Sequence, residues 1–223
     1  YDTLPSTSNA TLTASLTDPS VTADLMTAGS GLTANSGATW NWRSWDTGST
    51  NFAAAVAAND FWTWGFDVTA ASTNLDLTSM DIRLDRSGTG PDDFEIQASV
   101  NGAPAVSLLT YDFMDSDSGV DFIGVDLTAL GTLTTGDSVV FTLAVFNSES
   151  TSGTFDLETV DFGGSDPRAI RIEGTISGGA PDTTAPLVST LNPVDDATGV
   201  VVSSNLIITF DEPVQAGTGN ITI

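Results

Sequence analysis

Five aspartates crowd one short run of the chain, in the sequence DFMDSDSGVDFIGVD between residues 112 and 126. They are Asp112, Asp115, Asp117, Asp121 and Asp126. Carboxylates this close repel one another unless they share a cation, and hard oxygen ligands suit calcium. The pattern therefore makes Asp115, Asp117 and Asp121 candidate calcium ligands, and a solvated acidic loop is the alternative.

All five tryptophans fall in two other runs, ATWNWRSWDTGSTNF and FWTWGFDV. Because side chains two apart share one face of a strand, FWTWGFDV places Trp62, Trp64, Phe66 and Val68 together, which predicts a core-facing stripe. In TWNWRSW the same alternation separates Trp45 from the other tryptophans of that run.

Trp45 then shares a polar face with Arg43. An exposed tryptophan beside hydrogen-bonding groups commonly holds a sugar ring, so Trp45 and Arg43 are candidate glycan-binding residues. Two other interpretations stay open: Arg43 stacks on Trp45 as a surface cation–π pair, or Trp45 packs beneath a loop.

The chain contains no histidine and no cysteine. A Ser-His-Asp triad, a thiol nucleophile, disulfides and thiolate metal sites are therefore excluded. A glycosidase that uses two carboxylates needs no histidine, but no glutamate here lies in a recognisable signature. We expect a protein that is not an enzyme.

The charge balance is strongly acidic, with 29 Asp and Glu against five arginines and a net charge of −24. Such a charge destabilises the compact state unless salt or bound cations offset it, which favours a saline or calcium-bearing medium. The lack of a basic stripe excludes nucleic acid and anionic membrane surfaces as partners. The chain has no run of about 20 apolar residues, so the sequence predicts no membrane-spanning helix.

The elements that must position these groups are strands. FEIQASV alternates apolar and polar residues, AIRIEGTI predicts Ile170, Ile172 and Ile176 inward, and SVVFTLAVF is apolar on both faces, as in a central strand. NFAAAVAAND suits a short helix or an ordered loop. Many short strands with frequent turn signals indicate an all-β fold, a β-sandwich or jelly roll.

In RLDRSGTGPDDFE, arginines precede a Gly-Pro turn, and we expect an arginine–carboxylate pair to hold it. A clear boundary follows much later, at SGGAPDTTAP. We expect a β-sandwich or jelly-roll domain over residues 1–176, a linker over 177–186 and the N-terminal part of a second domain over 187–223. The chain begins at Tyr1 and its second domain is short, which favours a trimmed piece of a longer protein.

The segments DTTAP, NPVDDATGV, NLIITFDEPV and GTGNITI resemble the opening of a bacterial immunoglobulin-like repeat of the kind found in secreted adhesins. The resemblance covers nearly all of residues 182–223. It implies that Asp182, Asp211 and Glu212 hold calcium at the joint between domains. Ordinary turn chemistry of Asp is the alternative.

The first domain is similar to exported bacterial β-sandwich domains of proteins with PEP-CTERM-type sorting signals. The similarity rests on LDLTSMDIRLDRSGTGPDDFEIQASVNG, on AANDFWTWGFDVTA before it and on a closing strand at residues 168–176. It implies location more than chemistry.

The sequence therefore predicts a secreted or cell-surface module of a bacterial filament, sheath, matrix or large adhesin, stabilised by calcium and assembled by strand exchange. Its partners would be other copies of itself, other cell-surface proteins, or glycans. A carbohydrate-binding module of a secreted polysaccharide-active protein is the alternative.

Overall fold

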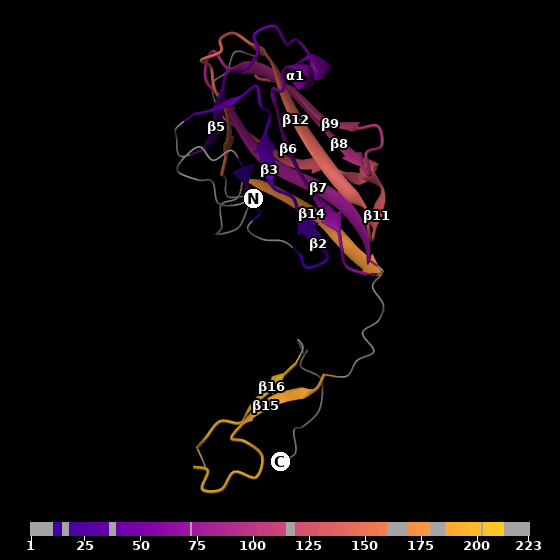
Figure 1. Cartoon of the computed structure of the whole chain (residues 1–223), viewed down its shortest axis with the longest axis vertical. Helices are drawn as coiled ribbons and strands as arrows, with labels where there is room; N and C mark the ends of the chain where they lie inside the picture. Colours follow the sequence, from indigo (N-terminus) through magenta and orange to yellow (C-terminus); the bar gives the residue numbers. More distant parts are fainter. Residues whose placement is uncertain are drawn as a thin grey trace. The chain divides into compact units, whose positions relative to one another are not determined.

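The computed structural model describes residues 11–14, 18–35, 39–71, 73–114, 119–159, 169–178, 186–201 and 203–211. The chain divides into two compact units, Tyr1–Gly179 and Ala180–Ile223, and each is described by itself (Figure 1). The strands of both units form antiparallel sheets, and strands dominate the regular structure of the described residues, so the predicted all-β class is confirmed.

The first sheet of unit 1 has the strand order β1-β3-β6-β12-β8-β9, and β2 also pairs with β6. Strand β12 lies between β6 and β8, which confirms the predicted central strand. The strands of this sheet are β1 (Thr11–Leu12), β2 (Val21–Ala23), β3 (Met26–Ala28), β6 (Phe61–Val68), β8 (Pro91–Val100), β9 (Val106–Asp112) and β12 (Ser138–Ser148).

The second sheet is built on the long strand β7, in the order β10-β7-β13-β5-β4. One edge of β7 pairs with β13 and then β14, and the other edge pairs with β10 and then β11. The strands of this sheet are β4 (Thr33–Ala34), β5 (Trp40–Arg43), β7 (Thr73–Arg86), β10 (Val120–Asp126), β11 (Thr132–Thr134), β13 (Phe155–Glu158) and β14 (Ile170–Gly178). Strand β14 thus reaches two residues into the segment expected to be the linker.

The core of unit 1 lies between these two sheets. Trp40 of β5 and Trp62 of β6 contact each other with ring centroids 4.9 Å apart, and Phe94 of β8 meets Phe122 of β10 at 5.2 Å. Because each pair joins one sheet to the other, the sheets form a sandwich. The stripe predicted from FWTWGFDV is confirmed, since all four of its residues are buried.

One α-helix, α1 (Phe52–Ala58), and one 3-10 helix, η1 (Thr128–Leu130), occur among the described residues. The alanine-rich run favours helix, and the side chain of Asn51 caps it by accepting a hydrogen bond from the Ala54 amide. Asn59 ends it in the left-handed region, with φ of 63°. Within the described part of the chain, no helix has the length and apolarity needed to cross a membrane.

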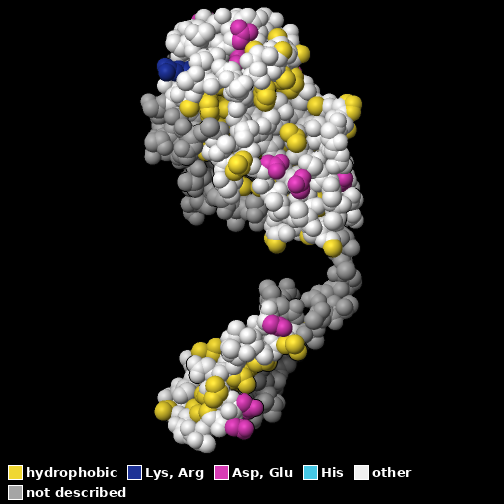
Figure 2. Space-filling view, viewed as in Figure 1, with side chains coloured by type: hydrophobic (Ala, Val, Ile, Leu, Met, Phe, Trp, Pro, Cys, Tyr) yellow, Lys and Arg dark blue, Asp and Glu magenta, His cyan; other side chains and the backbone are white. Residues whose placement is uncertain are grey.

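Unit 2 contains a two-stranded antiparallel sheet of β15 (Val188–Asn192) and β16 (Ile207–Phe210). Its apolar side chains are largely open to solvent, and hydrophobic atoms gather on the face seen in Figure 2. The exposed members are Leu187, Val188, Val194, Val200, Val201, Leu206 and Ile207.

Candidate functional site

The expected glycan platform at Trp45 is wrong, because the Trp45 side chain is only 1% exposed. Ser44 has a φ of 74°, which reverses the strand alternation after Arg43 and turns Trp45 inward. Its indole Nε1 donates to the Trp42 carbonyl at 3.0 Å, and its ring packs against Trp62 and Phe155. Trp45 therefore packs in the core. Of the interpretations left open by the sequence, this is closest to the one in which Trp45 packs beneath a loop.

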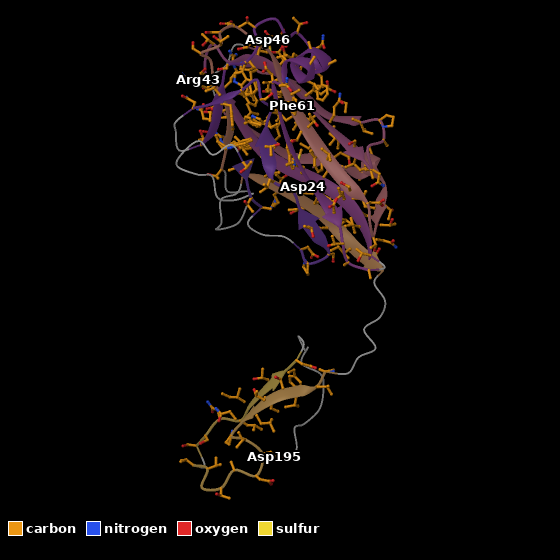
Figure 3. All side chains as sticks on the ribbon, viewed as in Figure 1. Asp24, Arg43, Asp46, Phe61 and Asp195 are labelled. Atoms are coloured by element: carbon orange, nitrogen blue, oxygen red, sulfur yellow. The ribbon has the colours of Figure 1, made fainter. Side chains whose placement is uncertain are left out.

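Arg43, the partner expected for Trp45, is exposed at the end of β5 (Figure 3). With Trp45 buried, the described residues place no tryptophan beside it on the surface. The pair cannot form the predicted sugar-binding surface.

The acidic run at residues 112–126 is only partly described, and Asp115 and Asp117 lie outside the described residues. Asp121 of β10 lies opposite Arg83 of β7 and accepts a hydrogen bond from its Nη1 at 2.7 Å. The Arg83 Nε donates to Glu158 of β13 at 2.8 Å. Arg83 is therefore shared by two carboxylates of neighbouring strands.

Of the acidic residues expected at the domain joint, only Asp211 is described, and Asp182 and Glu212 lie outside. The Asp211 Oδ1 accepts a hydrogen bond from the Leu187 amide at 2.8 Å, and the Asp211 amide donates to the Leu187 carbonyl at 3.0 Å. This reciprocal pair joins the two strands of unit 2. Among the described residues no group of three or more acidic side chains is close enough to hold a metal ion.

The arginine–carboxylate pair predicted at the Gly-Pro turn is confirmed. Arg86 is buried and forms an ion pair with Asp92 across the turn from β7 to β8. A second internal pair joins Arg171 of β14 to Asp81 of β7, which is 3% exposed. Both pairs hold neighbouring strands together, so their role is structural.

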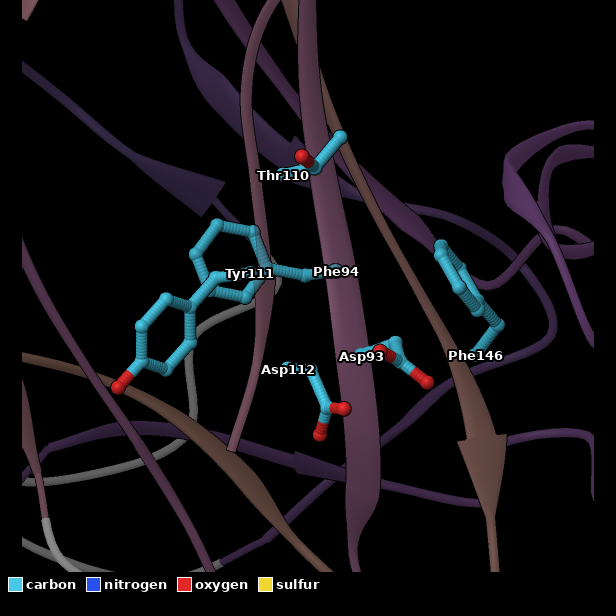
Figure 4. Close-up of a pocket in the computed structure, with 6 residues that line it drawn as sticks. All are labelled: Asp93, Phe94, Thr110, Tyr111, Asp112 and Phe146. Atoms are coloured by element: carbon cyan, nitrogen blue, oxygen red, sulfur yellow. The ribbon is translucent and has the colours of Figure 1, made fainter. Parts of the chain in front are cut away.

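An open pocket of about 220 Å³ lies on β8, β9 and β12 (Figure 4). Asp93 and Asp112 are directly opposite each other on β8 and β9. Asp93 accepts a hydrogen bond from the Asn147 side chain, and Asp112 accepts one from the Met114 amide. The pocket is lined by Asp93, Phe94, Thr110, Tyr111, Asp112 and Phe146.

This arrangement can hold a hydroxyl-bearing or cationic group, because two carboxylates are part of its lining. The alternation of β8 places Asp93 outward, as the sequence indicates. The pairing with Asp112 depends on the register between β8 and β9, which contains a bulge after Ile96, and no sequence signal gives that register.

The electrostatically most perturbed group of the second sheet is Asp156 on β13. It lies opposite Asp85 of β7 on one side and Asn41 of β5 on the other. Burial, and then the neighbouring carboxylates of Asp85 and Glu158, raise the pKa of Asp156 to about 7. This carboxyl therefore binds a proton near neutral pH in the folded state.

Comparison with known protein families gives a match for the C-terminal segment. Residues 182–223 match the family model of the bacterial Ig-like domain. The match confirms the resemblance of the C-terminal segment to an immunoglobulin-like repeat, and it covers the Ig-like segment alone. No curated protein matches the chain, and no solved structure matches it.

Proposed function

We propose that the chain is a non-catalytic structural or adhesive part of a bacterial cell-surface protein. The observation that carries the proposal is the match of residues 182–223 to bacterial Ig-like domains, which follow a separate β-sandwich unit here. Strings of β-domains are a common architecture for extended surface proteins. The acidic composition supports the same reading, since external salt and cations offset the net charge of −24.

Unit 1 would then be an exported β-sandwich of the kind associated with PEP-CTERM-type signals. The parent assembly would be a filament, sheath, matrix or large adhesin, with other copies or other surface proteins as partners. Calcium at the joint between domains, through Asp182, Asp211 and Glu212, would stiffen the chain by lowering local repulsion.

Surface location is tested by immunogold electron microscopy of intact source cells, with a serum raised against the whole chain. We expect label outside the outermost cell layer without permeabilisation. A serum against a ribosomal protein is the control and should label only permeabilised cells. If the chain is labelled only after permeabilisation, the proposal is contradicted.

Strand exchange would use the sheet of unit 2, because a two-stranded sheet is marginally stable alone and an open edge is a template for another strand. Its strands carry the exposed apolar residues Val188 and Ile207. Light scattering of the full chain over a wide concentration range should show association that Ile207→Asp abolishes. Val140→Asp, at an exposed site of unit 1, is the matched control and should still associate. If the wild-type chain stays monomeric at every concentration, the proposal of strand exchange is contradicted.

A further inference from the structure

The side chains of Asp156 on β13 and Asn41 on β5 each contain an oxygen atom that is shielded from solvent and has no hydrogen-bond partner among the described residues. In both side chains this atom is the Oδ1. The two residues lie directly opposite each other in the register of β13 and β5. Because directly opposite residues of an antiparallel pair project from the same face of the sheet, the carboxyl and the amide are neighbours.

A hydrogen bond already joins these two side chains. The Asn41 side-chain amide donates to the Asp156 carboxyl, and the Thr39 side chain donates to it as well. An amide carbonyl oxygen and an ionised carboxylate oxygen can only accept hydrogen bonds, so neither Oδ1 can satisfy the other. Buried polar atoms are seldom left without a partner, because the loss of their hydration is costly. One hydrogen atom between the two side chains would satisfy both atoms.

The surroundings of Asp156 disfavour an ionised carboxylate. Asp85 of β7 lies directly opposite Asp156 on the side away from β5, and Glu158 lies two residues further along β13. Burial, and then these two carboxylates, raise the pKa of Asp156 to about 7, whereas the hydrogen bonds from Thr39 and Asn41 oppose the shift. The bond from the Asn41 amide alone would therefore favour the ionised form.

The arginines of this sheet do not balance the carboxyl. Arg83 of β7 forms ion pairs with Glu158 and Asp121. Arg43 is exposed at the end of β5. Within the described part of the chain, the ion pairs of unit 1 do not include Asp156. A bound proton would neutralise this carboxyl and would also supply the donor that the two Oδ1 atoms lack.

We infer that Asp156 and Asn41 form a proton-dependent clasp between β13 and β5. With the proton bound, the Asp156 carboxyl donates to the Asn41 Oδ1 and accepts from the Asn41 Nδ2, so the two planar groups make two hydrogen bonds. Loss of the proton to solvent leaves two oxygen atoms facing each other, and their repulsion offsets the remaining bond. Because β5 joins β4 to the rest of the second sheet, deprotonation loosens this edge. The clasp does not depend on the surface role proposed above.

The variant Asp156→Asn imitates the protonated form, because its amide can also donate to the Asn41 Oδ1 and accept from the Asn41 Nδ2. A carboxyl whose pKa is raised in the folded state adds stability at low pH that is lost as the pH rises through that pKa. We therefore expect Asp156→Asn to match the wild type at pH 5. At pH 8 its equilibrium constant of unfolding should be smaller than that of the wild type by about 10- to 100-fold.

Urea unfolding followed by tryptophan fluorescence measures this difference. Other titrating groups are present in both proteins, so the comparison isolates Asp156. The control Asp121→Asn, on β10 of the same sheet, leaves the clasp intact and should change the unfolding constant by the same factor at both pH values. If the ratio between the wild type and Asp156→Asn is also the same at pH 5 and pH 8, the inference is overturned.

A double-mutant cycle separates the clasp from burial alone. Asn41→Ala, Asp156→Ala and their double variant give the coupling between the two side chains. The clasp predicts a coupling of at least about fivefold in the unfolding constant at pH 5, and a smaller one at pH 8, because one of the two hydrogen bonds is lost with the proton. If Asn41 only donates to an ionised carboxylate, the coupling instead grows toward pH 8, since charge-assisted hydrogen bonds are stronger. A coupling that grows with pH, or one that does not change, overturns the clasp.

Discussion

Arg86 gives the sharpest test of how unit 1 is held together. Its side chain is fully buried at the end of β7, where it forms an ion pair with Asp92. Its Nη2 donates to the Gly90 carbonyl at 2.9 Å and its Nε donates to the Ser87 carbonyl at 3.1 Å. One guanidinium therefore serves a carboxylate and two carbonyls of the turn that leads into β8.

The substitution Arg86→Met keeps the apolar stem of the side chain and removes the charge and the donors. Breaking a buried ion pair by removing one partner costs about 3–5 kcal/mol. The side chain of Asp92 is 21% exposed, so water can partly solvate the carboxylate that is left, and we expect about 3–4 kcal/mol. For a chain of this size that corresponds to a fall of roughly 6–16 °C in Tm.

Tryptophan fluorescence during urea or thermal unfolding is the suitable assay, because all five tryptophans lie in unit 1. The control Arg43→Met, at an exposed site, should change the free energy of unfolding by less than about 0.5 kcal/mol. The double variant Arg86→Met with Asp92→Asn should cost at least about 1 kcal/mol less than the sum of the single variants. A loss below about 1 kcal/mol for Arg86→Met, or strict additivity, would refute the reasoning.

Three further predictions use the same assay. Trp45→Ala should lower the free energy of unfolding of unit 1 by about 3–5 kcal/mol, because it leaves a cavity in the core. A change near zero would mean that Trp45 lies on the surface. The wild type should lose stability as the pH rises from about 5 to about 8, because the raised pKa of Asp156 makes the folded state bind a proton that the unfolded state has lost. Asp156→Asn should weaken this dependence of stability on pH. If the dependence is unchanged, other groups cause it. Arg83→Gln should cost no more than about 1 kcal/mol, since its ion pairs with Asp121 and Glu158 are partly exposed, and a larger loss would show that they act as a buried network.

The fold class was predictable because burial between two sheets leaves a period of two in the sequence. FWTWGFDV and FEIQASV keep that period over their whole length, and their inward residues lie where the alternation places them. The run SVVFTLAVF predicted a central strand, and β12 pairs with a neighbour on each edge. These patterns depend only on neighbours along the chain, so no knowledge of sheet order was needed.

The error at Trp45 arose where a single residue breaks that period. Ser44 adopts a positive φ and reverses the face on which Trp45 lies. The type of this residue does not signal the change, because a serine in the left-handed region is set by tertiary packing. Ile176 of β14 lies opposite the buried Leu75 of β7 and so keeps the face that alternation predicts, but it is 41% exposed.

The distribution of arginines is a physical reason to expect that external ions stabilise this chain. Arg86 forms an ion pair with the half-buried Asp92, and Arg171 forms one with the buried Asp81. Arg83 bridges Asp121 and Glu158. These few cations therefore fix strand register inside unit 1 and do little for the carboxylates spread over its surface, where Figure 2 shows few basic atoms. Since the net charge is −24, we expect salt or bound cations to offset the remaining repulsion.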